Sequence, residues 1–236
     1  MQPGKMQPGK KQSGNIMTWT LLTLVTCCGS GRAEANLVKY SDVFGSAVTF
    51  SGICETSTET GPFYGQPVAM GDAVVSPGVG FLTQSVNGQI GMVNGRLQMT
   101  LTADPGFLID GVSINQSGSW LGFGNAANLI ASTHAMLATD QGTFTGSALF
   151  SAAGNGGGIR EEGLSIGIPA TGRAVFSLDH QLLSSADSGG AAFVDTSSIR
   201  ISVSTMAASV PEPQVALLLS GIAAGTGICR MRRRRN

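Results

Sequence analysis

The sequence predicts an all-β protein, a β-sandwich or jelly-roll-like single domain, lying between an N-terminal signal peptide and a short C-terminal transmembrane helix. Three observations support this prediction. Short segments of residues 36–209 alternate apolar and polar residues, turn residues separate these segments, and uncharged apolar runs flank them at both ends. A hydrophobic fraction of 42% excludes a wholly disordered chain, and the 34 glycines follow no collagen period.

Residues 1–35 have the layout of a secretory signal peptide. A polar, basic start leads into the apolar run Trp19–Cys28, and Ala33 and Ala35 form a small-x-small signal peptidase site. The apolar run is too short to span a bilayer, which needs roughly 20 residues. We therefore expect the Sec export machinery and signal peptidase as partners, and a mature chain that begins at Asn36. Lipidation at Cys27 is a weaker alternative, because a threonine precedes it.

Residues 36–209 are predicted to form the β-sandwich body, with several segments as its strands. Asn87-Gly88 and Asn94-Gly95 are signals for type I′ hairpins, which would separate strands at 80–86, 89–93 and 96–102. Asp104-Pro105-Gly106 predicts a turn into a strand at 107–114, and a further strand follows at 120–123 after polar residues 116–119. The alternation in 198–204 predicts the last strand.

The segments between residues 126 and 180 alternate apolar and polar residues less regularly. Phe144, Gly146, Ala148 and Phe150 are expected on one strand face, and Ala174, Phe176, Leu178 and His180 on another. Residues 126–138 are the best helix candidate, although they fit a strand equally well. Residues 154–158 are expected to be a flexible glycine-rich loop that divides the two halves of the body. This loop lacks the Gly-Lys-Ser/Thr of a phosphate site.

Catalytic patterns are scarce, so we predict that the protein is not an enzyme. The only histidines are His134 and His180. His180 continues an apolar face and is expected in the core or on an edge strand, whereas His134 has no neighbouring ligand set. Glu161-Glu162 is predicted to be a solvated loop, because adjacent strand residues point to opposite faces. Cys54, the only cysteine of the body, is expected to be a buried thiol, with an intermolecular bridge as the alternative.

No metal or cofactor is predicted, and two binding alternatives stay open. Acidic turn residues are candidate Ca²⁺ ligands without an assigned set: Asp104, Asp110, Asp140, Asp187 and Asp195. An aromatic surface for stacking sugars is a second alternative, formed by Trp120, Tyr40, Phe63 and Tyr64. Residues 36–211 contain five basic and twelve acidic side chains, a net charge of −7. Nucleic acid is therefore not an expected partner.

Residues 210–236 contain three features in order. Pro211-Glu212-Pro213 interrupts any helix, residues 214–229 carry no charge, and a basic cluster ends the chain: Arg230, Arg232, Arg233, Arg234 and Arg235. A helix over 214–229 would measure roughly 24 Å, against a hydrocarbon core of about 30 Å. Snorkelling arginines and local thinning can accommodate that difference, and the positive-inside rule keeps the cluster cytoplasmic.

This C-terminal segment resembles the sorting signal of the PEP-CTERM family of bacterial surface proteins. The resemblance covers about 26 residues. It implies recognition by exosortase, a membrane sorting enzyme, and cleavage near Pro-Glu-Pro. It further implies transient anchoring in the inner membrane, followed by display on the cell surface or release. A plain membrane anchor without processing is the alternative.

The first hypothesis is thus an exported surface or extracellular-matrix protein, structural or adhesive in an exopolysaccharide or biofilm setting. A carbohydrate-binding module that holds exopolysaccharide is the alternative. A secreted hydrolase that uses His134 or His180 is a third class.

Overall fold

The computed structural model describes residues 36–57, 62–124 and 126–208. These residues form strands and contain no helix, and all of the strand pairs are antiparallel. Sheet A has seven strands: β1 (Asn36–Lys39), β2 (Val43–Phe44), β3 (Val48–Ser57), β7 (Ile90–Ala103), β9 (Asn128–Thr139), β10 (Gly142–Ala153) and β12 (Arg173–Ser185). Sheet B also has seven: β4 (Val68–Ala69), β5 (Ala73–Ser76), β6 (Leu82–Val86), β8 (Phe107–Phe123), β11 (Gly156–Thr171), β13 (Ala191–Asp195) and β14 (Ser198–Ala207).

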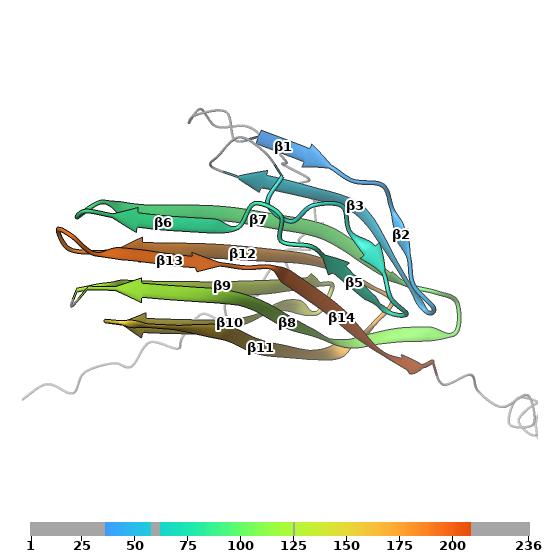
Figure 1. Ribbon diagram of the computed structural model, residues 1–236. Coiled ribbons are helices and arrows are strands. Elements are labelled where there is room, and N and C mark those ends of the chain that lie inside the picture. The colour runs from blue at the N-terminus through green and yellow to red at the C-terminus, as the bar shows by residue number, and fades with distance from the viewer. Residues whose placement is uncertain (1–35, 58–61, 125, 209–236) are drawn as a thin grey trace, which may run out of the picture. The chain divides into compact units, whose positions relative to one another are not determined.

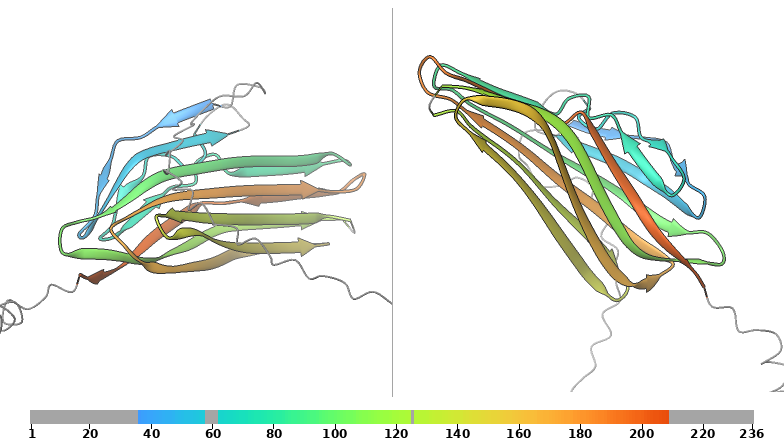
Figure 2. Two further views of the ribbon diagram at one scale, coloured as in Figure 1. Left: turned by 180° about the vertical axis from the view of Figure 1, so that it is seen from behind. Right: turned by 60° about the horizontal axis from the view of Figure 1, so that its bottom comes forward.

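The two sheets pack face to face, as the ribbon views show (Figures 1 and 2). The order in sheet A is β1-β3-β7-β12-β9-β10, with β2 also paired to β3. The order in sheet B is β4-β5-β14-β8-β13-β6, with β11 on the other side of β8. The predicted all-β, sandwich-like architecture is therefore confirmed.

The core lies between the sheets and follows the predicted alternation. Leu97, Met99 and Leu101 of β7 are buried, and so are Ile199, Ile201 and Val203 of β14. Inward residues of neighbouring strands bury their apolar surface against one another, which is the main stabilising contribution. Every member of the described core cluster lies between residues 43 and 203. A fragment of residues 36–208 thus contains both sheets and their core, and is expected to fold on its own.

Neither Asn-Gly pair forms the predicted hairpin, although the first of them is a turn. Asn87-Gly88 is a turn with φ values of 55° and 83°, but it carries the chain from β6 of sheet B to β7 of sheet A. Asn94-Gly95 lies inside the continuous strand β7. A Cβ on Gly95 would lie 2.7 Å from Cζ of Phe81, so this glycine provides space for an aromatic ring rather than a turn.

Other local predictions also need correction. Residues 126–138 do not form a helix, because Asn128–Thr139 is strand β9 with alternating burial. Residues 116–119 do not separate two strands, since β8 runs unbroken from Phe107 to Phe123. Glu161 and Glu162 lie in β11 rather than in a loop. The glycine-rich segment supplies only a tight turn at Gly154, where φ is 79°, and the chain passes there from sheet A to sheet B.

Candidate functional site

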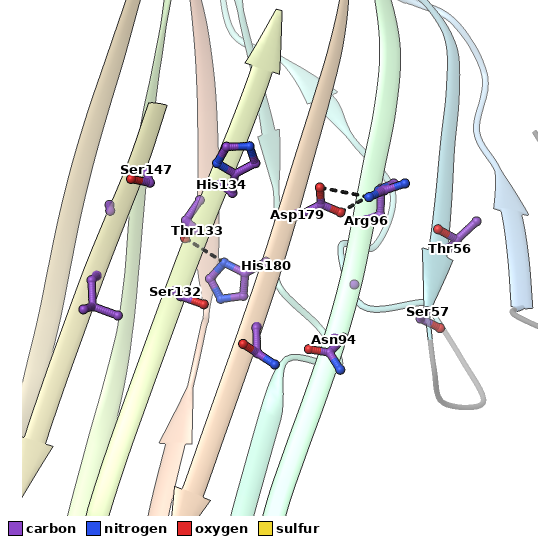
Figure 3. Close-up of a pocket in the computed structure, with 14 residues that line it drawn as sticks. Thr56, Ser57, Asn94, Arg96, Ser132, Thr133, His134, Ser147, Asp179 and His180 are labelled. Atoms are coloured by element: carbon purple, nitrogen blue, oxygen red, sulfur yellow. Dashed lines mark hydrogen bonds and ion pairs between the residues drawn. The ribbon is translucent and has the colours of Figure 1, made fainter. Parts of the chain in front are cut away.

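A row of polar side chains crosses the outer face of sheet A. Antiparallel register places one residue from each of five adjacent strands side by side. We call this set the cross-strand row: Thr56, Arg96, Asp179, His134 and Ser147. At a strand separation of about 4.8 Å, the row extends for about 19 Å. Figure 3 shows these side chains on their neighbouring strands.

The cross-strand row lies in an open groove of about 730 Å³, which we call the sheet A groove. A second row of register neighbours adds to it Asn94, Gln181, Ser132 and Leu149. The side chains that line the groove are mostly hydroxyls, amides and charged groups, and Leu149 contributes an apolar surface that is 70% exposed. The groove therefore offers both donors and acceptors to a ligand.

The charges of Arg96 and Asp179 balance each other within the sheet A groove. Nε of Arg96 donates to Oδ1 of Asp179 at 2.5 Å, and Nη2 donates to Oδ2 at 3.1 Å. This two-pronged contact keeps the Arg96 side chain across the middle of the groove (Figure 3). The hydrogen bond to Asp179 raises the pKa of Arg96 above its ordinary value. Both side chains are about half exposed, so the pair contributes little to stability and remains accessible to a ligand.

Directly beneath the groove, six side chains form a closed hydrogen-bonded ring between the sheets. We call it the interlayer ring, and its members in order are Gln116, Thr133, His180, Thr196, Arg160 and Glu162. Two of them, Thr133 and His180, also line the groove. The ring joins β9 and β12 of sheet A to β8 and β11 of sheet B. It ties the outer face of sheet A to the layer below.

Arg160 is the charged centre of this ring. Its Nη1 donates to Oε1 of Glu162 at 2.6 Å, and its Nε and Nη2 donate to the carbonyl oxygen of Asp195 at 2.9 and 2.7 Å. The Arg160 side chain is 0% exposed and that of Glu162 is 8% exposed. A buried charge is tolerated when it is paired and hydrogen-bonded, as it is here.

His180 is held as a neutral imidazole. Nδ1 lies 3.1 Å from Oγ1 of Thr133, and Nε2 lies 3.0 Å from Oγ1 of Thr196. Burial, and after it the positive charge of Arg160, lower the pKa of His180 from 6.5 to about 3. A hydroxyl can donate or accept, so the two threonines satisfy either neutral tautomer. The prediction that His180 is a core residue is confirmed.

His134 lies apart from this ring, exposed on the outer face. It is the register neighbour of Asp179 on one side and of Ser147 on the other. Serine, histidine and aspartate are thus adjacent in the cross-strand row. Within the described part of the chain, however, no hydrogen bond joins His134 to either neighbour, and Asp179 binds Arg96 instead.

The predicted aromatic sugar-stacking surface is wrong. Phe63 and Tyr64 are buried, and Phe63 stacks on Phe81 with a centroid separation of 4.9 Å. Tyr40 and Trp120 are half-buried, and the Trp120 ring lies 6.2 Å from that of Phe150. These aromatic side chains belong to the core and its margins rather than to one exposed platform.

The buried carboxylate of Glu55 explains why Phe63 and Tyr64 are held in place. It accepts hydrogen bonds from the backbone amides of both residues and from the hydroxyl of Tyr40, the last at 2.7 Å. Sequence reasoning gave Glu55 no role, because the chain segment that supplies these amides lies eight residues further on. The Cys54 thiol beside it is buried, as predicted.

The acidic residues considered for calcium do not converge. Among the described residues, no group of three or more His, Cys, Asp or Glu side chains is placed to hold a metal ion. Asp195 instead accepts hydrogen bonds from the amide and hydroxyl of Ser119, at 2.6 and 3.0 Å. Asp110 lies within strand β8 rather than in a turn.

The sorting residues lie outside the described part of the chain. This holds for Ala33 and Ala35, for Pro211, Glu212 and Pro213, and for the arginine cluster at Arg230, Arg232, Arg233, Arg234 and Arg235. Within residues 36–57, 62–124 and 126–208, no helix has the length and apolar character needed to cross a membrane.

Comparisons with known proteins show only distant similarity. No protein-family model matches the chain, and no curated protein sequence matches it. Among solved structures, TmCBM61 in complex with β-1,4-galactotriose is 11% identical, with 64% of this chain and 88% of that chain covered and a TM-score of 0.28. The CBM22-1 xylan-binding domain of Paenibacillus barcinonensis Xyn10C is 12% identical, with 71% and 92% covered and a TM-score of 0.22.

The enzymatically active domain of bacteriophage CBA120 tailspike protein 4 is also similar. It is 15% identical, with 54% of this chain and 20% of that chain covered, at a TM-score of 0.25. Scores this low carry no argument about function.

Proposed function

We propose that this protein is an exported bacterial surface or extracellular-matrix protein whose β-sandwich binds a neutral polysaccharide in the sheet A groove. The observation that carries the binding proposal is the groove itself, an open surface across five strands with balanced charge and many neutral polar groups. Sugar hydroxyls both donate and accept hydrogen bonds. A lining of hydroxyls and amides beside one Arg–Asp pair meets both needs.

Charge supports a neutral ligand over an anionic one. Arg96 is neutralised by Asp179 within the groove, and residues 36–211 have a net charge of −7. A polyanion would therefore be repelled by the body without gaining an unpaired cation in the site. The openness of the groove suits an internal segment of a long chain, and exposed Leu149 offers apolar contact to the C–H face of a sugar.

A pull-down with the 36–208 fragment and a panel of neutral and acidic polysaccharides tests the binding proposal. We expect retention on a neutral polymer, with little change between about 0.05 and 0.5 M salt, because no net charge is neutralised. Replacing Asp179 and His134 together by Ala should weaken retention about ten-fold, since a lost hydrogen bond to a charged group costs roughly 1.5–3 kcal/mol. Glu161→Ala on sheet B is the matched control. Retention that is equal in the double variant would contradict the proposal.

We also propose that binding is not followed by hydrolysis. A histidine that activates a serine must lie within hydrogen-bond reach of it and be oriented by the acid. Here the carboxylate of Asp179 is occupied by Arg96. Incubation with the retained polysaccharide should release no new reducing ends. Release that disappears in His134→Ala would instead establish the hydrolase alternative.

Export and sorting are a separate part of the proposal, supported by the sequence motifs at the two ends. The mature surface protein is expected to begin at Asn36 and to end near Pro211-Glu212-Pro213, after processing by exosortase. Intact-mass measurement of the protein released from the cell surface tests both sites at once. A precursor with both ends intact, found only in the cytoplasm of export-competent cells, would refute this part.

A further inference from the structure

Strand β10 forms an open edge of sheet A. Within the described part of the chain it pairs only with β9, through all twelve residues from Gly142 to Ala153 and without a register shift. In an antiparallel edge strand, every second residue directs its backbone N–H and C=O away from its neighbour. This edge therefore presents a long row of backbone groups that a further strand can pair with.

The other sheet edges in the described residues have features that discourage such pairing. The edge strands β1, β2, β4 and β6 have only four, two, two and five residues. Strand β11 is long, but it carries Arg160, Glu161 and Glu162, and its register shifts around Pro169. Short strands, charges, proline and bulges are the usual means of blocking edge-to-edge association. Strand β10 has none of them.

The sequence of β10 is nearly symmetric about Ser147. Reading outward from that residue, Gly146 matches Ala148 and Phe144 matches Phe150. Thr143 and Ser151 complete the symmetry with a hydroxyl at each end. Thr145 and Leu149 are the one pair that breaks the symmetry. The strand is otherwise complementary to its own antiparallel copy, because its other residues meet partners of similar size and character.

We propose that β10 pairs with β10 of a second copy of this chain, with Ser147 on the two-fold axis. In this register Phe144 lies opposite the second copy's Phe150 on the inner face, where both are half-buried. On the outer face, Thr143 lies opposite the second copy's Ser151. No two like charges meet, and the interface is isologous, as a closed dimer requires.

The pairing joins the two sheet A grooves. Ser147 ends the cross-strand row in each copy, so the row continues through the second copy's Ser147 into its His134 and Asp179. The dimer then presents one uninterrupted polar surface across both sheets. A polymer that follows the row in one copy can continue along it in the other.

Cysteine cross-linking of the 36–208 fragment tests the partner and the register together. Paired residues have Cα atoms about 4.5–5.5 Å apart, within disulfide range, so Ser147→Cys is expected to give a disulfide-linked dimer on mild oxidation. In this register, Thr143→Cys would lie about 27 Å from the same residue of the second copy and should not cross-link. Ser41→Cys, exposed between β1 and β2 at the opposite edge of sheet A, is the control for random collision. Equal cross-linking of all three, or none in Ser147→Cys, overturns the proposal.

A charge placed on the two-fold axis gives an independent test without oxidation. Ser147→Lys sets two ammonium groups opposite each other, so sedimentation should show at least a ten-fold higher dissociation constant for the dimer. Ser41→Lys, at the opposite edge of sheet A, should leave the dimer unchanged. A wild-type fragment that stays monomeric, or a Ser147→Lys variant that associates as strongly as the wild type, refutes the pairing.

Discussion

Protonation of His180 is predicted to destabilise the fold in mild acid. Its pKa is lowered from 6.5 to about 3 by burial and by Arg160, whereas in the unfolded chain it returns to its ordinary value. Between these two values the unfolded state binds more protons, so stability falls as the pH falls. From pH 7 to pH 5, this group alone should remove about 2 kcal/mol of the free energy of unfolding.

Urea unfolding of the 36–208 fragment at pH 7 and pH 5 measures this loss. Carboxylates also titrate in acid, so the comparison with His180→Gln isolates the histidine. Between pH 7 and pH 5, the free energy of unfolding of His180→Gln should fall by about 2 kcal/mol less than that of the wild type. His134→Gln removes an exposed histidine and should retain the wild-type dependence. Equal pH dependence of the wild type and His180→Gln would refute the reasoning.

Three further substitutions should be measurable by urea unfolding at pH 7. Gly95→Ala should lower the free energy of unfolding by about 1–3 kcal/mol, because its Cβ would lie 2.7 Å from a core phenylalanine ring. Its control, Gly167→Ala, has open space around it and should change the free energy of unfolding by less than about 0.5 kcal/mol. Arg160→Met should lower the free energy of unfolding by about 3–5 kcal/mol, because it leaves a buried carboxylate unpaired. Its control, Arg96→Met, breaks an exposed ion pair and should lower the free energy of unfolding by less than about 1 kcal/mol. Glu55→Gln should cost about 1–3 kcal/mol, because an amide cannot accept all the hydrogen bonds of the buried carboxylate. Equal losses within either of the first two pairs, or no loss in the third, would contradict the packing described.

Strand positions could be predicted from the sequence where one face is buried and the other is solvated. The alternation in β14 and in residues 96–102 is such a case, because period-two burial leaves a direct pattern in the residues. The failures arose at residues whose role depends on a distant segment. Asn94-Gly95 has the composition of a turn, but Gly95 is required by the ring of Phe81, which only the fold brings near.

The candidate site was harder to predict than the fold. Thr56, Arg96, Asp179, His134 and Ser147 come from five strands and share no spacing or motif. Only the register of sheet A places them in one row. Burial of His180 was predictable from its apolar neighbours at positions 174, 176 and 178. The interlayer ring around it was not, since its five other members come from β8, β9, β11 and the loop between β13 and β14.

The most direct test of binding in the sheet A groove is to map where a bound saccharide contacts the molecule. Amide chemical shifts of the 36–208 fragment should be recorded during titration with a neutral oligosaccharide from a polymer that retains it. We predict that the perturbed amides cluster around Arg96, His134, Ser147 and Asp179, in the middle of sheet A. Shifts confined to the outer face of sheet B, or no shifts with any such oligosaccharide, would contradict the proposal that the sheet A groove is the binding site.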